Sequence, residues 1–352
     1  MFYNRTNQRS VIMTEQKIEY QNEPYHKYKY PEYLVILILL AIVTTVGIFL
    51  LMFGMNEAFF VPNETVYTIF ELITFLGDEL GFVILFSFIY FAFDKRFSRR
   101  LMWSFMLSTH VNTTLKVFFK DPRPPSNGYF GDPATGYGLP SGHTQGSVGF
   151  YGFTFHQFKG NKAKGTVAVR IISFLLLVLV PVSRLILGVH DVQDVLFGYI
   201  FGYGILLIYF MLEPWLLSLK TKLPLIVKIL IGVIASVGLW VGSILLFPTL
   251  EEKYEFGLTC GVLLGFSIAF PLEEKFVRYD PTKMKTWQRL VFGIVGAIIT
   301  VGLYFGLSFI FKLLPNQEGL NFIYRLLKYF LLAIIVSLLV AYIFTLFTKK
   351  KE

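Results

Sequence analysis

The sequence predicts an all-α fold, a polytopic bundle of about ten transmembrane helices. Of its 352 residues, 55% are hydrophobic and only 16% are charged, a balance far more apolar than that of a soluble domain. Apolar runs of about 20 residues recur along the chain, and a helix of that length crosses the hydrocarbon core while satisfying its own backbone hydrogen bonds. Basic residues gather in short clusters between these runs, as in multi-pass membrane proteins.

The apolar segments divide the chain into three parts. They fall at roughly 32–54, 80–94, 101–119, 142–158, 167–183, 194–213, 225–247, 256–272, 289–312 and 322–347. Residues 1–31 hold no apolar run, so we expect a flexible cytoplasmic tail there. We expect residues 32–216 to form a membrane core, and residues 217–352 to add further transmembrane helices.

The basic clusters predict the orientation of the bundle. With the N-terminus inside, the clusters at 95–100, 159–164, 220–222, 275–289 and 349–351 all face the cytoplasm. Because these residues are scattered between spans, the net charge of +9 indicates topology and gives no reason to expect a nucleic-acid partner. Lys120, Arg123 and Arg184 break the rule, since they lie in or beside loops predicted on the outer side. Cations placed there call for a chemical explanation.

The first of three polar blocks on that outer face contains two cations. Lys116 lies near the end of the third segment, and Arg123 follows in a loop with prolines at 122, 124 and 125. Proline fixes its own φ angle, so this loop is suited to holding a guanidinium in place. Both cations can bind phosphate oxygens.

The second block is a tight turn that opens the fourth segment, with the sequence Pro140, Ser141, Gly142, His143. The backbone N–H groups of Ser141 and Gly142 at a helix start are expected to bind an anion. His143 is placed to protonate a leaving oxygen.

The third block carries Ser183 and Arg184, then His190 and Asp194 before the sixth segment. Four residues separate His190 from Asp194, which on a helix places them on one face. The carboxylate can then accept the Nδ1 proton and leave Nε2 as a nucleophile. Arg184 supplies a third cation for phosphate.

These blocks, from Lys116 to Pro124, from Pro140 to His143 and from Ser183 to Asp194, resemble the three signature blocks of the type 2 phosphatidic acid phosphatase (PAP2) superfamily. The resemblance covers roughly residues 75–215. It implies a core of about six helices, with about four C-terminal spans outside it, and release of phosphate from a membrane lipid phosphate or diphosphate.

The resemblance also implies a role for each block residue. His190 would form a phosphohistidine, Asp194 would orient it and His143 would act as the general acid. The phosphate would be bound by Lys116, Arg123, Ser141, Gly142 and Arg184. No metal or other cofactor is expected, and no cluster with metal-ligand spacing occurs in the sequence. The site would face the non-cytoplasmic side of the membrane. We expect this membrane to be the cell membrane.

Several alternatives stay open at the level of sequence. The pocket could transfer the phosphoryl group from His190 to a lipid or sugar acceptor, or the protein could be a transporter or scramblase that only binds lipid phosphate. Phosphatidate, phosphatidylglycerophosphate, a sphingoid phosphate and a polyprenyl diphosphate all carry suitable head groups. The C-terminal spans could shape lateral access for lipid, form a homo-oligomer or carry a separate activity, with packing as the default.

Overall fold

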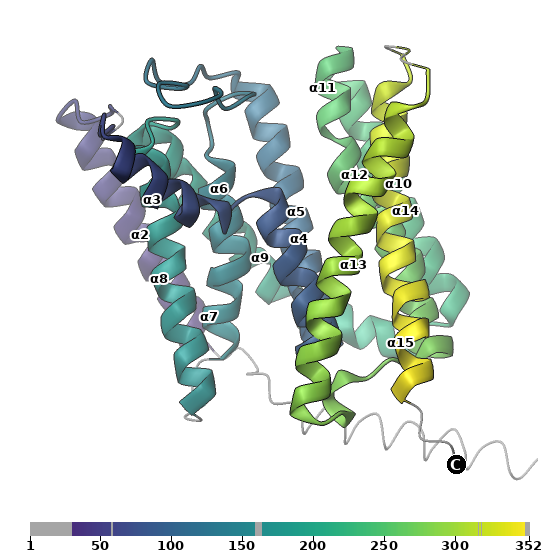
Figure 1. Cartoon of the computed structure of the whole chain (residues 1–352). Helices are drawn as coiled ribbons and strands as arrows, with labels where there is room; N and C mark the ends of the chain where they lie inside the picture. Colours follow the sequence, from purple (N-terminus) through teal and green to yellow (C-terminus); the bar gives the residue numbers. More distant parts are fainter. Residues whose placement is uncertain (1–29, 58, 159–163, 316, 318, 349–352) are drawn as a thin grey trace, which may run out of the picture.

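The computed structural model describes residues 30–57, 59–158, 164–315, 317 and 319–348, so residues 1–29 of the expected tail lie outside it. Within these ranges every regular element is a helix (Figure 1). The first group is α2 (Tyr30–Met52), α3 (Glu64–Phe75), α4 (Glu79–Phe88), η1 (Ile89–Phe93), α5 (Lys95–Phe119), α6 (Gly142–Ser147), η2 (Val148–Gly152), α7 (Phe153–Gln157), α8 (Lys164–Ile186) and α9 (Val192–Lys222). The second group is α10 (Leu225–Leu246), α11 (Leu250–Glu255), α12 (Gly257–Leu272), η3 (Glu273–Val277), η4 (Pro281–Lys283), α13 (Thr286–Lys312), α14 (Asn321–Ile334), η5 (Ile335–Val340) and α15 (Ala341–Thr348).

This architecture confirms the predicted all-α polytopic bundle. In the described part of the chain, seven helices are long and apolar enough to cross a membrane, and an eighth crossing arises if α3 and α4, bent by 45° at their junction, count as one span. Each of the predicted apolar segments is helical, but α5 and the short helices from 142 to 157 do not belong to that apolar set. The count of ten crossings therefore stays a prediction.

The polar helices α5 and α6 lie inside the bundle. On α5, Ser104, Ser108 and Asn112 are buried, and on α6 Thr144 and Gln145 are almost completely buried. Neighbouring helices thus cover the polar side chains that would be costly against lipid. A helix covered in this way does not need an apolar surface, which is why α5 and α6 can carry the polar blocks.

The helices form two groups that lie side by side (Figure 1). The first group runs from α2 to α9 and the second from α10 to α15. Aromatic rings join them, with the centroid of the Phe91 ring 5.0 Å from that of Phe344 and 5.8 Å from that of Tyr279. The first group ends at Lys222, where α9 ends, whereas the sequence predicted a core over residues 32–216. The division into domains stays a prediction.

Glycines let the helices approach closely within each group. A Cβ atom on Gly198 of α9 would lie 2.7 Å from the Cβ atom of Thr144 on α6. A Cβ atom on Gly261 of α12 would lie 2.4 Å from the Leu326 carbonyl oxygen of α14. Small residues at such contacts are how membrane helices gain van der Waals packing without a hydrophobic driving force. The first contact fixes α6, which opens with the second polar block, against α9.

A buried ionic cluster ties α5 to the second group. Glu273 of η3 is fully buried and accepts hydrogen bonds from Lys95, at 3.0 Å, and from Arg99. On the same turn of α5, Arg100 binds Glu213 of α9 through two hydrogen bonds of 2.7 and 2.6 Å. These pairs lie at the start of α5. Lys116 lies roughly 31 Å further along this helix, about the thickness of the hydrocarbon core.

Candidate active site

The start of α9 holds His190 and Asp194 together. Asp191 is the N-cap of this helix, and its side chain accepts a hydrogen bond from the Asp194 N–H at 2.9 Å. The Asp194 carboxylate accepts in return from the Asp191 N–H, which completes a capping box. The imidazole Nδ1 of His190 lies 2.7 Å from the Asp194 Oδ2 atom. The two side chains therefore meet, as the sequence predicted.

The geometry that joins them differs from the expected one. The sequence argument placed both residues on one helical face, but α9 begins at Val192, so His190 lies before the helix. The capping turn, rather than the helical period, brings the imidazole over the carboxylate. The turn also buries both groups, because His190 is 1% exposed and Asp194 is 0% exposed.

Two hydrogen bonds fix the tautomer of His190. The Asp194 carboxylate accepts a hydrogen bond from the N–H at Nδ1. On the other side, the Arg123 Nη1 atom lies 3.2 Å from the His190 Nε2 atom. Since a guanidinium can only donate, Nε2 presents its lone pair toward Arg123. The ring nitrogen that faces the cations is thus the unprotonated one.

The loop from 120 to 140 folds over this site and uses both cations of the first block. Arg123 donates to the carbonyl oxygens of Gly136 and Thr135, at 3.0 and 2.7 Å. Lys116 donates to the carbonyls of Tyr137 and Gly138. Neutral carbonyls are weaker partners for a cation than a phosphate dianion is. A bound phosphate can therefore take over both side chains.

Gly138 allows the loop to come this close. A Cβ atom at this position would lie 2.9 Å from the Oδ2 atom of Asp194 and 3.1 Å from the Oδ2 atom of Asp121. The Gly138 N–H also donates to the Asp121 carbonyl at 2.8 Å. The loop thus packs its backbone directly against the carboxylate that orients His190.

His143 has a partner that sequence reasoning missed. Its Nε2 atom lies 2.7 Å from the Oδ1 atom of Asp78, in the turn between α3 and α4. Asp78 lies outside the three blocks in the sequence, and its acidic side chain gave no sign of this contact. Burial and the nearby charge of Arg184 disfavour the protonated imidazole, and the Asp78 carboxylate opposes them by accepting a hydrogen bond from Nε2.

The second block is arranged differently from the prediction. The Ser141 N–H is not free for an anion, because it donates to the Asp194 carbonyl at 2.9 Å, and Ser141 is fully buried. The Ser141 hydroxyl caps α6 by accepting from the Thr144 N–H. Gly142 lies against the first block, since its Cβ position is 3.3 Å from the Asn112 Oδ1 atom and 3.9 Å from the Lys116 Cε atom.

Arg184 lies at the end of α8 and reaches the same region. Its Nη1 atom donates to the Thr74 hydroxyl at 2.8 Å, and its Nε atom is buried with no hydrogen-bond partner among the described residues. Arg184 is only 7% exposed. A buried guanidinium with an unused donor is suited to binding an anion.

The site collects positive charge around His190. In the part of the chain that the structure describes, no carboxylate oxygen lies within 4.0 Å of the nitrogens of Lys116, Arg123 or Arg184. Burial, together with the nearby charges of Lys116, Arg184, Arg123 and His143, holds the pKa of His190 well below its ordinary value. His190 is therefore neutral at physiological pH, as a nucleophile has to be.

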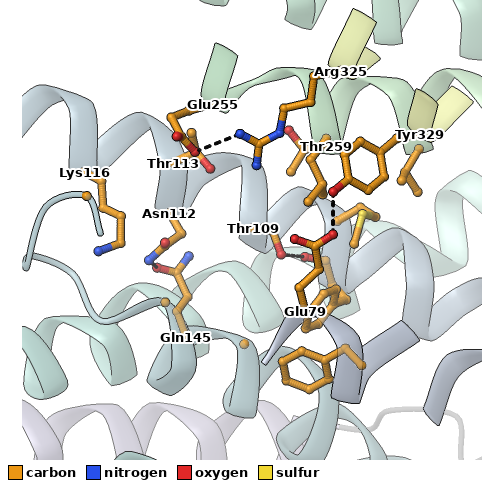
Figure 2. A pocket seen from close by; sticks show the side chains of 18 of the residues that line it. Glu79, Thr109, Asn112, Thr113, Lys116, Gln145, Glu255, Thr259, Arg325 and Tyr329 are labelled. Atoms are coloured by element: carbon orange, nitrogen blue, oxygen red, sulfur yellow. Dashed lines mark hydrogen bonds and ion pairs between the residues drawn. The ribbon is translucent and has the colours of Figure 1, made fainter. Parts of the chain in front are cut away.

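Asn112 of α5 connects the first block to the second. Its side-chain amide donates to the Pro140 carbonyl at 3.1 Å and to the Gln145 Oε1 atom at 2.9 Å (Figure 2). It lies one helical turn before Lys116, so it links the helix that carries Lys116 to the turn that carries His143. The structure thus brings residues of all three predicted blocks into one site.

Fold and site together define a polytopic helical membrane protein with a buried histidine and carboxylate pair surrounded by cations. The sequence model of the PAP2 superfamily matches residues 97–217, and that of the PAP2 superfamily phosphatase transmembrane extension matches residues 257–352. The chain belongs to the PAP2 superfamily. The second match assigns the C-terminal helices to a known extension of the family, which sequence reasoning had left outside the core.

One relative of known name is similar over part of its length. Sphingosine-1-phosphate phosphatase 1 of Mus musculus is 24% identical over 226 residues, which cover 60% of this chain and 52% of that protein. The chain thus matches about half the length of this relative. No solved structure gives a significant match.

Proposed function

We propose that this protein removes phosphate from a membrane lipid phosphate, with His190 as the nucleophile. The observation that carries the proposal is the pair of hydrogen bonds on its imidazole. The protonated Nδ1 atom lies 2.7 Å from the Asp194 Oδ2 atom, and the unprotonated Nε2 atom lies 3.2 Å from the Arg123 Nη1 atom. A nucleophilic nitrogen beside a phosphate-binding cation is the arrangement that phosphoryl transfer to histidine requires.

The reaction has two steps in this proposal. The phosphate oxygens bind Lys116, Arg123 and Arg184, and the Nε2 lone pair of His190 attacks phosphorus. The bond from phosphorus to the lipid oxygen breaks, and His143 donates a proton to that oxygen. In the second step His143 accepts a proton from water, the hydroxyl attacks phosphorus, and the bond from phosphorus to Nε2 breaks. Inorganic phosphate leaves and both histidines return to their starting states.

The predicted orientation places this site on the non-cytoplasmic side, and we expect the membrane to be the cell membrane. The loop from 120 to 140 lies at one end of the bundle (Figure 1). The starts of α5 and α13, which carry Arg96 and Arg289 in the sequence, lie at the other end. The positive-inside rule assigns the basic end to the cytoplasm.

The substrate class follows from the family and from the relative. The relative is named for a phosphatase acting on sphingosine-1-phosphate, and the chain is embedded in a membrane, so we infer an amphiphilic phosphate for this protein as well. Monophosphates and diphosphates both offer the oxygens that three cations can bind.

Phosphate release from a lipid panel tests the proposal. The purified protein is assayed with EDTA against sphingosine-1-phosphate, phosphatidate, phosphatidylglycerophosphate and a polyprenyl diphosphate, beside the variant His190→Ala. We expect the wild type to release phosphate from at least one lipid and the variant to release none.

The other outcomes are informative as well. If chelation abolishes release, the reaction depends on a metal, contrary to the proposal. If phosphate appears on a lipid or sugar acceptor instead of in solution, the protein is a phosphotransferase. If His190→Ala retains full activity, the assigned nucleophile is wrong.

A further inference from the structure

A cavity of about 720 Å³ lies between the two groups of helices. Its volume falls in the range of small-molecule sites, which is roughly 300–1,000 Å³. One wall comes from α4, α5 and α6, and the other from α11, α12 and α14 (Figure 2). The second group of helices therefore forms one wall of a chamber that the core alone cannot close.

One end of the cavity reaches the active site. Lys116, Arg123 and His143 all line it. Asn112 and Gln145 lie beside Lys116 and continue this polar part of the wall (Figure 2). A phosphate bound by Lys116 and Arg123 would thus have open space next to the oxygen that links it to the rest of the substrate.

The remainder of the cavity has a largely apolar wall. On the core side it is lined by the buried rings of Phe82, Phe86 and Phe105. On the side of the extension it is lined by Val262, Leu332 and Val336. An apolar chamber that continues from a cationic site matches the two halves of an amphiphile.

Two polar contacts hold α14 in place in the wall of the chamber. The Tyr329 hydroxyl of α14 donates to the Glu79 carboxylate of α4 at 2.5 Å. The Arg325 Nη1 atom lies 3.6 Å from the Glu255 Oε2 atom. Both pairs belong to the wall of the cavity (Figure 2). The first contact joins α14 to α4 across the chamber, and the second joins α14 to α11 within the second group.

We propose that this cavity holds one hydrocarbon chain of the substrate while its phosphate lies at Lys116 and Arg123. The C-terminal extension is then part of the substrate site and not only packing around the core. This inference rests on the proposed function for the identity of the phosphate group, whereas the position of the chain follows from the cavity.

Photo-crosslinking locates the chain without turnover. A non-hydrolysable alkyl phosphonate with a diazirine at the chain end is bound to the wild-type protein in detergent, irradiated and mapped by mass spectrometry. We expect adducts on α5, α12 and α14, competed by an excess of the unlabelled phosphonate. Adducts confined to lipid-facing residues such as Leu175 of α8 and Ile231 of α10, which are 49% and 53% exposed, would overturn the inference.

A cavity-filling variant supplies a second test. Val262→Trp places an indole in the apolar wall, and Leu331→Trp, on the exposed side of α14, is the matched control. We compare kcat/KM for a sixteen-carbon alkyl phosphate with kcat/KM for a four-carbon alkyl phosphate. We expect Val262→Trp to lower the ratio of the first to the second by about tenfold or more. We expect Leu331→Trp to keep the wild-type ratio. A folded Val262→Trp protein with an unchanged ratio contradicts the inference.

The two tests separate this inference from the proposed function. If the wild type releases no phosphate but the adducts map to α12 and α14, the hydrolase proposal fails and the chain site stands. If the wild type is active and the adducts lie on the lipid-facing surface, the hydrolase proposal stands and the chain site fails. The crosslinking result also decides the matter if Val262→Trp does not fold.

Discussion

His190 depends on two partners with opposite hydrogen-bonding roles. Asp194 accepts the Nδ1 proton, and Arg123 directs a donor at Nε2. The carboxylate determines which ring nitrogen is protonated, and the guanidinium is the group beside which we propose that the phosphate binds. Removing the carboxylate should therefore change the tautomer without changing the fold.

The variant Asp194→Asn tests this dependence. An asparagine can offer its amide N–H to the ring, which stabilises the tautomer with the proton on Nε2 and removes the nucleophilic lone pair. By analogy with the same change in a serine protease triad, we expect kcat to fall about 10³-fold or more. The control is Asp191→Asn, because asparagine is an equally good N-cap. A loss of activity in the control as large as that in Asp194→Asn would indicate that the capping turn, and not the tautomer, is responsible.

Asp78 provides a second prediction at this scale. It accepts a hydrogen bond from His143, which we propose as the general acid. Asp78→Asn removes the charge that stabilises the protonated imidazole, so protonation of the leaving oxygen should become limiting. We expect kcat for an alkyl phosphate to fall about 10²-fold, and kcat for para-nitrophenyl phosphate, whose leaving group needs little protonation, to fall far less. Equal losses for both substrates would argue that Asp78 acts on the fold instead.

At the scale of the elements, close helix contacts determine whether the cavity exists. The second group of helices depends on the approach of α12 to α14, where the Cβ position of Gly261 lies 2.4 Å from a backbone oxygen of α14. A larger side chain has no flexible neighbour that can move aside. The two helices that form one wall of the cavity would then separate.

Gly261→Leu should accordingly lower the unfolding temperature by several degrees, since overpacking typically costs about 1–3 kcal/mol. Gly302→Leu on α13 is the control, because a Cβ atom there has no neighbour within 4 Å. Thermal unfolding of both variants in one detergent gives the comparison. A Gly261→Leu protein as stable as the control would show that α12 and α14 do not need this contact.

The elements also show how far sequence reasoning reaches. Apolar runs predicted the helices, because a helix that spans the membrane needs about 20 consecutive apolar residues. The three blocks predicted that His143, His190, Lys116 and the arginines would meet, since topology places all of them at one end of the bundle. Neither the apolar runs nor the three blocks predict the conformation of a turn. The capping box that orients His190 and the bend that carries Asp78 depend on backbone geometry and long-range packing.

Sequence also did not predict the cavity. The extension looked featureless because its helices are mostly apolar, which is equally true of helices that face lipid and of helices that line a chamber. Only the packing of α12 and α14 against α4 and α5 distinguishes the two. The polar groups in that wall, Tyr329 and Arg325, have partners far away in the sequence, at Glu79 and Glu255.

At the scale of the whole molecule, the buried ionic cluster around Glu273 and the candidate site around His190 lie at opposite ends of the bundle. Glu273 with its basic partners ties the first group to the second at one end. The loop over His190 closes the other end. With the membrane between them, the two ends face different compartments.

Cysteine labelling in intact cells checks the orientation. Asp132 is exposed in the loop beside the site, and the side chain of Lys283 is 83% exposed at the opposite end. We expect a membrane-impermeant maleimide to label Asp132→Cys in intact cells and Lys283→Cys only after lysis. The native Cys260 is 1% exposed and should contribute little background. The reverse pattern would place the active site in the cytoplasm.

The most direct test of a histidine nucleophile is to trap the phosphorylated protein. The wild type and His190→Ala are mixed with a radiolabelled lipid phosphate, quenched in alkali, which preserves a phosphorus–nitrogen bond, and digested for peptide mapping. We predict label on the peptide that contains His190 in the wild type, which is lost on chase with unlabelled substrate, and none in the variant. Phosphate release by the wild type with the label on another residue, or equal labelling of His190→Ala, would contradict a phosphohistidine at this position.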